Sequence, residues 1–140
     1  MTVNAKGKAK QHSENMKAAS ARSQGDPVYV GQGEGMVDIT PADDALIHCI
    51  AVADQDIASG AYGSYITKGT VTMTVPSATY VAGDGLLMLD GVVTSTGAAF
   101  PAAAGVAGEA QTVFGSIHTG GTTVTEIEVT LHGKPFTATT

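Results

Sequence analysis

Three segments of the chain repeat one pattern, in which a short apolar run, a glycine-containing turn and a second apolar run follow one another. The segments are GDPVYVGQGEGMVDIT (residues 25–40), GAYGSYITKGTVTMTV (60–75) and GDGLLMLDGVVTST (83–96). Apolar runs rich in β-branched residues favour strands, and glycine supplies the backbone conformations that tight turns need. The pattern therefore predicts three β-hairpins and argues against a helical fold.

The third hairpin carries two aspartates that could be taken for a pair of working carboxylates. Asp90 precedes Gly91, and a two-residue Asp-Gly loop between apolar runs is a strong hairpin signal because both positions need positive φ. Asp84 lies in a Gly-Asp-Gly lead-in, where unusual backbone geometry is tolerated. We interpret Asp90 as a turn residue and Asp84 as part of the lead-in to the hairpin, and neither as a working carboxylate.

The rest of the chain supplies further strands. ALIHCIAVA (45–53) is continuously apolar, as expected of a strand buried on both faces, and 123–133 alternates from Ile127 onward, as expected of a half-buried one. AAFPAAAGVAGEA (98–110) is expected to form a short alanine-rich helix or loop, since Pro101 and the nearby glycines exclude a long helix. With 140 residues, 43% of them hydrophobic, the chain suits one domain. We predict a mainly β fold, a compact small barrel or sandwich of short hairpins.

The first 24 residues differ from the rest in charge and in pattern. They hold five basic residues and one acidic residue, a net charge of +4, whereas the remainder has a net charge of −10. They show no strand alternation and few large apolar side chains, so we expect a flexible N-terminal arm. The predicted organisation is an arm at 1–24, a β body at 25–134 and a C-terminal tail at 135–140. The basic residues of the arm are Lys6, Lys8, Lys10, Lys17 and Arg22.

Residue types that often carry catalysis or bind metals occur here without the spacing that such sites require. The four histidines form no HxH or HxxxH pair, and Cys49, the only cysteine, lies in an apolar run as expected of a buried, inert thiol. GQGEG (31–35) leads into a strand rather than a helix, so we interpret it as a hairpin loop and not a phosphate loop. The histidines are His12, His48, His118 and His132, and the aspartates interpreted as solvated loop residues are Asp43, Asp44, Asp54 and Asp56. We expect no enzyme activity, no metal and no cofactor.

Composition also bears on partners and location. The N-terminus has no apolar stretch typical of a secretory signal, and nothing approaches the ~20 apolar residues of a membrane helix. The acidic body would repel phosphate backbones, so nucleic acid is not an expected partner. We expect a chain that is made in the cytoplasm and does not enter a membrane.

The body, roughly residues 25–134, resembles a family of bacteriophage capsid decoration proteins, also called cement proteins, of the lambda-like head decoration type. The likeness is carried by GDPVYV, GMVDITPADDA, IAVADQDIASGAYGSYITKGTV, AGDGLLMLDGVVTSTG, GVAGEA and TVTEIEVTLHG. The arm at 1–24 is longer and more basic than the usual start of the family.

The resemblance implies a non-enzymatic protein that binds the outer surface of the mature head and stabilises it by bridging subunits of the major capsid protein, often as a homotrimer. It also implies an N-terminal segment that orders on the shell by adding to a sheet edge, and synthesis in the host cytoplasm before assembly into the virion. The basic arm residues are the candidate capsid-binding residues. The alternative is a small β module of a phage tail or adhesion structure that binds a ligand or carbohydrate through Tyr29, Tyr62, Tyr65 and Tyr80.

Overall fold

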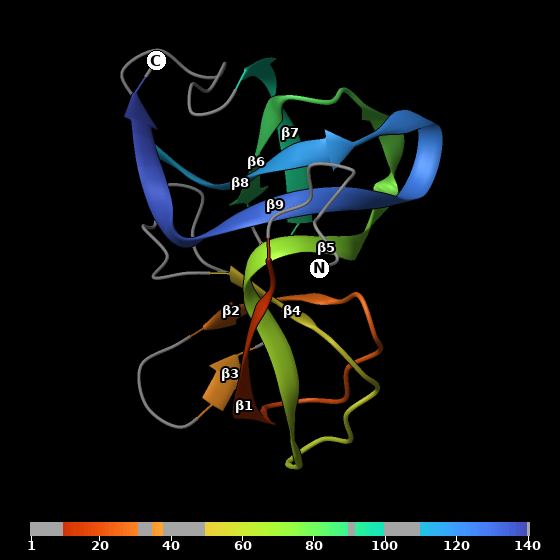
Figure 1. The fold of residues 1–140 in the computed structure, drawn as a ribbon, viewed down its shortest axis with the longest axis vertical. Coiled ribbons are helices and arrows are strands. Elements are labelled where there is room, and N and C mark those ends of the chain that lie inside the picture. Colours follow the sequence, from red (N-terminus) through yellow and green to blue (C-terminus); the bar gives the residue numbers. More distant parts are fainter. Residues whose placement is uncertain (1–9, 31–34, 38–49, 90–91, 100–109, 140) are drawn as a thin grey trace, which may run out of the picture.

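The computed structural model describes residues 10–30, 35–37, 50–89, 92–99 and 110–139, and these residues form nine strands without a helix (Figure 1). The strands are β1 (His12–Ala18), β2 (Pro27–Val30), β3 (Gly35–Val37), β4 (Ile50–Ala53), β5 (Tyr62–Tyr80), β6 (Asp84–Leu89), β7 (Val92–Ala99), β8 (Ala110–Thr119) and β9 (Gly121–Thr139). No helix within these ranges is long and apolar enough to cross a membrane.

The long strand β5 belongs to both halves of the molecule. In one half, β1, β3, β2, β4 and the first part of β5 pair in that order, and an additional β1–β5 pairing closes the five strands into a ring. In the other half, the second part of β5 continues the sheet to β9, β8, β6 and β7. Figure 1 shows the two halves stacked along the long axis, with β5 passing from one to the other. The predicted mainly β fold is confirmed.

Two of the three predicted hairpins are confirmed. β2 pairs with β3 through Tyr29 and Val37, and β6 pairs with β7 up to Leu89 and Val92. Both pairs are antiparallel. The Asp90-Gly91 turn itself lies outside the described residues, but the pairing that flanks it has the register of a two-residue loop.

The hairpin predicted for 60–75 is wrong, because β5 runs through this segment without reversing. Gly69 has a φ of +103°, so the glycine does adopt a turn-like backbone conformation. Its effect is to bend the strand and to change which face its side chains occupy. Ile66 and Val71 belong to the same core cluster, although strict alternation would place an even and an odd position on opposite faces. Gly69 therefore acts as a break in register within one strand.

The N-terminal segment contributes to the sheet, in contrast to the unstructured arm that we expected. β1 pairs antiparallel with β5, from Lys17 and Tyr62 at one end to His12 and Lys68 at the other. Its side chains are mostly exposed, so its sequence carries little apolar pattern. Main-chain pairing holds most of this strand, and its end adds apolar burial through Ala18 and Met16 at the smaller core cluster. Residues 1–9 are outside the described part of the chain.

The C-terminal segment also differs from expectation, and the alanine-rich segment is only partly described. β9 continues through Thr139, and its end pairs with the start of β8 at Ala110, so part of the predicted tail at 135–140 belongs to the sheet. In the alanine-rich segment, 98–99 end β7 and Ala110 begins β8. The predicted helix or loop between them falls on residues outside the described ranges.

Most of the buried apolar side chains among the described residues belong to two clusters, which lie on opposite faces of β4 and the first part of β5. All four residues of β4 are buried, which confirms the prediction of a strand buried on both faces for the described residues 50–53. The larger cluster lies mainly in the second half of the molecule and contains Ile50, Val52, Ile66, Val71, Met73, Val75, Tyr80, Leu86, Val93, Phe114, Ile117, Ile127, Val129 and Leu131. The smaller cluster contains Ala18, Val28, Ala51, Ala53, Ile57 and Tyr65.

Candidate interaction surface

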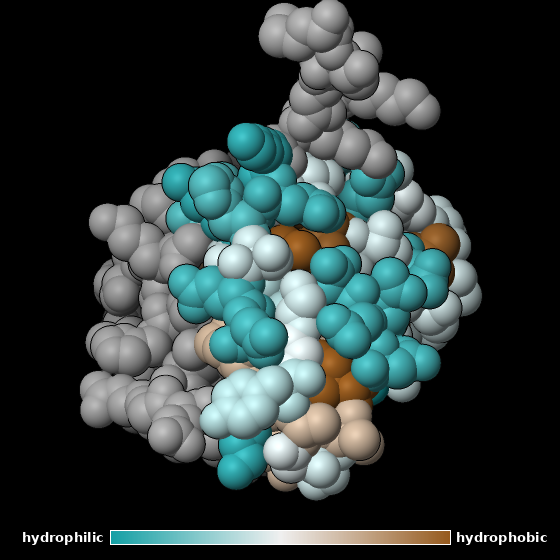
Figure 2. Space-filling view, turned by 60° about the horizontal axis from the view of Figure 1, so that its bottom comes forward, coloured by the Kyte–Doolittle hydropathy of each residue, from teal (hydrophilic) through white to brown (hydrophobic). Residues whose placement is uncertain are grey.

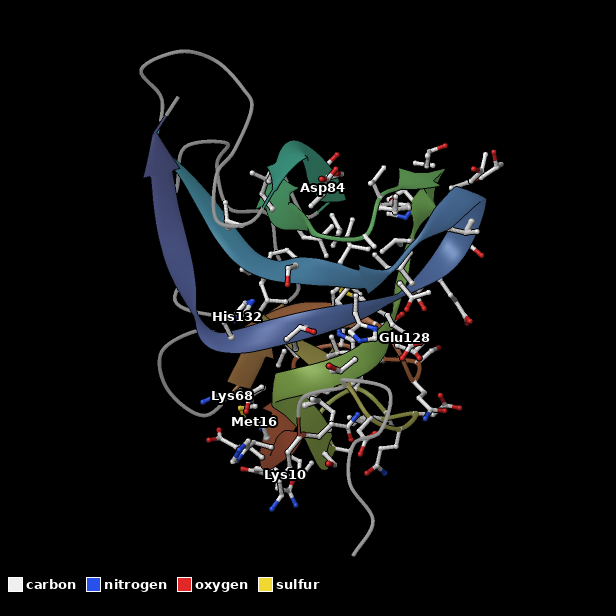
Figure 3. All side chains as sticks on the ribbon, turned by 45° about the horizontal axis from the view of Figure 1, so that its top comes forward. Lys10, Met16, Lys68, Asp84, Glu128 and His132 are labelled. Carbon is white, nitrogen blue, oxygen red and sulfur yellow. The ribbon has the colours of Figure 1, made fainter. Side chains whose placement is uncertain are left out.

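The basic residues singled out in the sequence occupy different environments. Lys10 and Lys17 are exposed, Lys17 on β1 and Lys10 just before it. Lys6 and Lys8 lie outside the described residues. In Figure 3, Lys10 lies in the half of the molecule that contains β1, whereas Asp84 on β6 lies in the other half. Lys10 and Lys17 are therefore accessible for contacts with another molecule.

Arg22 is part of the folded body. Its main chain bridges that of Ile57 through two hydrogen bonds of 2.8 Å, one in each direction. Its side chain is half-buried and lies close enough to Tyr65 for its charge to act on the phenol. Burial raises the pKa of Tyr65 above 10.0, and the positive charge of Arg22 partly offsets that effect. Arg22 thus serves the packing around the smaller cluster.

The described aspartates of the loops are exposed or half-buried, and two of them accept hydrogen bonds from the main chain. Asp26 Oδ2 accepts from the Ser23 N–H at 2.8 Å, and Asp56 Oδ1 accepts from the Gln24 N–H at 2.9 Å. Carboxylates that cap main-chain N–H groups in this way hold loops in place. Asp43, Asp44 and Asp90 lie outside the described residues.

The histidines that the structure describes are dispersed. His12 is exposed on β1, and His118 Nδ1 lies 3.1 Å from the Thr119 hydroxyl. His132 on β9 lies 3.4 Å from the Ser116 hydroxyl, and burial together with the charge of Lys68 lowers its pKa. Within the described ranges, no three residues among His, Cys, Asp and Glu are grouped as metal ligands would be. His48 and Cys49 lie outside those ranges.

Of the four tyrosines proposed for sugar stacking, two are unavailable and one is exposed, and the side chain of Tyr29 lies outside what the structure describes. Tyr65 and Tyr80 are buried, at 0% and 4% exposure, whereas Tyr62 is 61% exposed. Burial raises the pKa of the Tyr80 phenol, whose hydroxyl donates to the Pro76 carbonyl oxygen at 2.6 Å. The face shown in Figure 2 is covered mainly by hydrophilic residues, with small separate apolar spots. Partners of this face are therefore expected to use polar and main-chain contacts.

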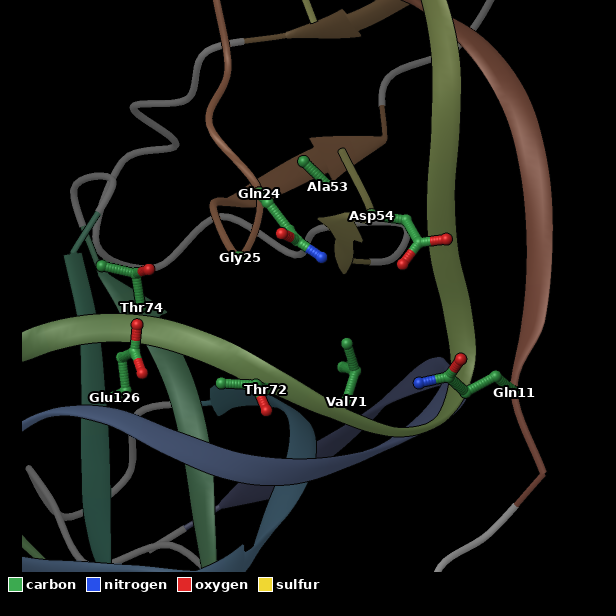
Figure 4. Close-up of a pocket in the computed structure, with 9 residues that line it drawn as sticks. All are labelled: Gln11, Gln24, Gly25, Ala53, Asp54, Val71, Thr72, Thr74 and Glu126. Carbon is green, nitrogen blue, oxygen red and sulfur yellow. The ribbon is translucent and has the colours of Figure 1, made fainter. Parts of the chain in front are cut away.

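A pocket of about 330 Å³ opens where the two halves meet, between the edge of β5 opposite β9 and the segments that precede β2 and follow β4 (Figure 4). Its lining residues are Gln11, Gln24, Gly25, Ala53, Asp54, Val71, Thr72, Thr74 and Glu126. Two carboxylates and two carboxamides are among them, and none of the lining residues is basic. We call this site the β5-edge pocket.

The main chain around the pocket explains why it is open. Gly25, with a φ of +95°, donates its N–H to the Ala53 carbonyl oxygen and accepts from the Thr74 N–H at 2.9 Å. At the other end, the Gln11 carboxamide donates to the Thr70 carbonyl oxygen at 2.8 Å. Thr72 lies midway between these two contacts, and its only strand partner in the described part of the chain is β9. The pocket is thus a short interruption in the pairing of β5.

Sequence reasoning missed this site because its members come from five separated parts of the chain. The signal in the sequence is Gly25, the first residue of the predicted β body. A glycine followed by Asp-Pro also fits a sharp turn against another strand, and that turn forms one end of the pocket.

Comparison with known proteins by sequence gives no match, neither to a protein-family model nor to a curated protein. Comparison by structure gives a match to the head fiber gp8.5 N base in bacteriophage phi29, with a TM-score of 0.54 and 15% sequence identity. The alignment covers 91% of this chain and 98% of that chain. At this level of identity the likeness is one of fold.

Proposed function

We propose that this chain is a non-enzymatic structural protein of a bacteriophage head, and more specifically a capsid decoration protein on the outer surface of the mature shell. The observation that carries the proposal is the fold shared with a phage head fiber base over nearly the full length of both chains. The finer part of the proposal, decoration of the outer surface, comes from the resemblance of the body's sequence to capsid decoration proteins.

The proposed mechanism combines a rigid body with a basic N-terminal segment. The body, with two clusters joined through β5, supplies a fixed surface against subunits of the major capsid protein. The segment that carries Lys6, Lys8 and Lys10 reaches to a neighbouring subunit. Each exposed ion pair contributes only about 0–1 kcal/mol, so apolar and main-chain contacts carry most of the binding. A homotrimer on the shell would gain avidity from repeated weak contacts.

The test is co-sedimentation with expanded, undecorated capsids of the encoding phage. The full chain is compared with a variant that lacks residues 1–9, which leaves β1 intact, and with a chain in which Lys68, an exposed residue of β5 outside the arm, is replaced by glutamine as a single-charge control. Saturable binding of the full chain, retained by the control and weakened in the shortened variant, supports the proposal. The absence of saturable binding by the full chain overturns it.

Salt dependence separates the two parts of the mechanism. Because ion pairs at the surface are screened by salt, binding is expected to weaken as the salt concentration rises but to persist. Complete loss of binding at moderate salt would contradict the dominance of apolar and main-chain contacts. Trimer formation on the shell is tested separately by counting bound copies per capsid.

A further inference from the structure

β7 is the last strand of the sheet and has one edge without a strand partner in the described part of the chain. The strand order ends at β7, which pairs with β6, and Figure 1 shows β7 in the half of the molecule that does not contain β1. In an antiparallel pair, residues that bond to the partner strand alternate with residues whose N–H and C=O groups point the other way. Leu89 and Val92 flank the two-residue loop as a bonded pair, and Thr94 belongs to the next one. The N–H and C=O groups of Val93 and Ser95 therefore point to the open edge.

This open edge is short and regular. The register between β6 and β7 is constant from Val92 to Ser95 and shifts beyond Ser95, where Gly97 has a φ of +72°. The irregularity at Gly97 ends the regular pairing. The open edge thus consists of residues 92–95, which we call the β7 edge, and it offers the main-chain groups of Val93 and Ser95 to another strand.

The β7 edge lacks the features that keep exposed edges from pairing. Proteins usually protect an open edge with charged side chains, with proline, with a bulge or with a covering segment. β7 reads VVTSTGAA, and the sequence has no charged residue between Asp90 and Glu109. The one charged residue of β6, Asp84, pairs with Ala99 beyond the irregularity. The exposed side chain at the centre of the edge is the small, uncharged Thr94. An edge of this kind is suited to pairing with another strand.

Charge and symmetry favour a second copy of this chain as the partner. The chain has a net charge of −6, so two copies repel each other where their charged surfaces meet, and the uncharged β7 edge avoids that repulsion. Two antiparallel β7 edges also match each other. Val93 of one copy lies opposite Ser95 of the second copy, and Thr94 lies opposite Thr94. Threonine pairs across antiparallel strands are stabilising.

We propose that two copies of this chain pair through their β7 edges, antiparallel, about a two-fold axis at Thr94. Each Val93–Ser95 pair exchanges both of its N–H···O bonds, and β6 and β7 of the two copies form one continuous sheet. A contact of this kind closes with two copies, so it is a different interface from the one that a homotrimer on the shell needs. It does not depend on the head-decoration role. Because the edge is short, the association is weak and is measured at high protein concentration.

Disulfide cross-linking tests the position of the two-fold axis. In the proposed pairing the two Thr94 residues form a non-hydrogen-bonded pair, whose Cα atoms lie about 4.5 Å apart. That separation is within the range that a disulfide spans. Thr94→Cys is made in a chain in which Cys49→Ser removes the natural thiol, and Thr79→Cys in the same background is the control at another exposed threonine. Under mild oxidation, Thr94→Cys should form covalent dimers about tenfold faster than the control. Equal rates would overturn the proposal.

Sedimentation equilibrium tests the main-chain pairing. Proline is tolerated at an edge position whose N–H points away from the partner strand, so Ser95→Pro keeps the β6–β7 pairing and removes the outward N–H. Ser95→Ala is the matched control, because it also loses the hydroxyl that accepts from the Gly97 N–H at 3.2 Å but keeps its own N–H. We expect Ser95→Ala to associate like the full chain and Ser95→Pro about tenfold more weakly. A monomeric full chain, or equal association of both variants, would contradict the pairing. Circular dichroism checks that the variants are folded.

Amide hydrogen exchange distinguishes a second copy from a cover within one chain. The N–H groups of Val93 and Ser95 should become more protected as the protein concentration rises, whereas Thr94, which bonds to β6, is protected at every concentration. Protection of Val93 and Ser95 that does not change with concentration would mean that the same chain covers the edge. That result, or fast exchange at every concentration, would refute the proposal.

The two proposals fail separately. If Ser95→Pro is monomeric and still sediments with capsids, both the β7 contact and the head-decoration role are supported. If the full chain forms dimers through β7 but shows no saturable binding to capsids, the head-decoration role is wrong and the β7 contact stands.

Discussion

At the scale of single residues, the two buried tyrosines differ in one hydrogen bond. The Tyr80 hydroxyl donates to the Pro76 carbonyl oxygen, whereas the Tyr65 hydroxyl is buried and finds no hydrogen-bond partner among the described residues. We therefore expect Tyr80→Phe to lower the free energy of unfolding by about 1 kcal/mol. Tyr65→Phe should leave that free energy unchanged or raise it. Urea unfolding of both variants measures the difference, and equal losses would show that Tyr65 has a partner.

His132 should make the free energy of unfolding depend on pH. Burial and the Lys68 charge lower its pKa below 6.5 in the folded state, so the unfolded chain takes up the proton first as the pH falls. The free energy of unfolding should therefore decrease on acidification from about pH 7.5 through 6.5, until the folded state is protonated as well. The variant His132→Gln should show a shallower decrease, and the exposed His12→Gln serves as control. Identical pH profiles for His132→Gln and the parent would rule out this contribution.

At the scale of elements, Gly69 decides where β5 bends and where β1 begins. A Cβ on residue 69 would collide with the main chain of Lys10 and Gln11, in addition to straining a backbone with φ of +103°. Gly60 has a φ of +79° but open space around it. Gly60→Ala should therefore cost about 1–2 kcal/mol from strain alone, and Gly69→Ala distinctly more. Amide resonances of residues 10–12 should move only in Gly69→Ala. If both variants lose the same free energy of unfolding, Gly69 is needed only for its backbone conformation and not for the close approach of residues 10 and 11.

How far the sequence predicts these elements depends on where their stabilising contacts lie. Strands with an apolar alternation of their own, such as 127–131 in β9, can be predicted from the sequence, because their apolar residues recur at every second position and show which face is buried. β1 could not be predicted in this way, because it is held largely by main-chain pairing with β5, which needs no particular side chains. The sequence predicts a glycine-containing turn within 60–75, but a positive φ at Gly69 is compatible with a reversal or with a bend, and only the partner strands decide between them. The β5-edge pocket depends on the same long-range pairing, so its residues could not be grouped in advance.

At the scale of the whole molecule, the continuous strand β5 predicts that the two halves unfold together. β5 contributes Tyr65 to the smaller cluster and Met73 to the larger, so neither cluster keeps its packing if this strand is lost. Small domains with such shared elements usually unfold in one transition. With 3-fluorotyrosine incorporated, the buried Tyr65 and Tyr80 report on the two clusters by fluorine NMR. Both native resonances should disappear with the same urea midpoint.

A variant in one half makes this test stricter. Met73 is fully buried in the larger cluster, so Met73→Ala should lower the free energy of unfolding by about 2–5 kcal/mol. If the halves are coupled through β5, the midpoints reported by Tyr65 and Tyr80 shift by the same amount, although Tyr65 belongs to the other cluster. A shift confined to Tyr80 would mean that the ring of β1, β3, β2, β4 and β5 is stable by itself. A body that unfolds only as a unit presents one rigid surface, which the proposed attachment to the capsid requires.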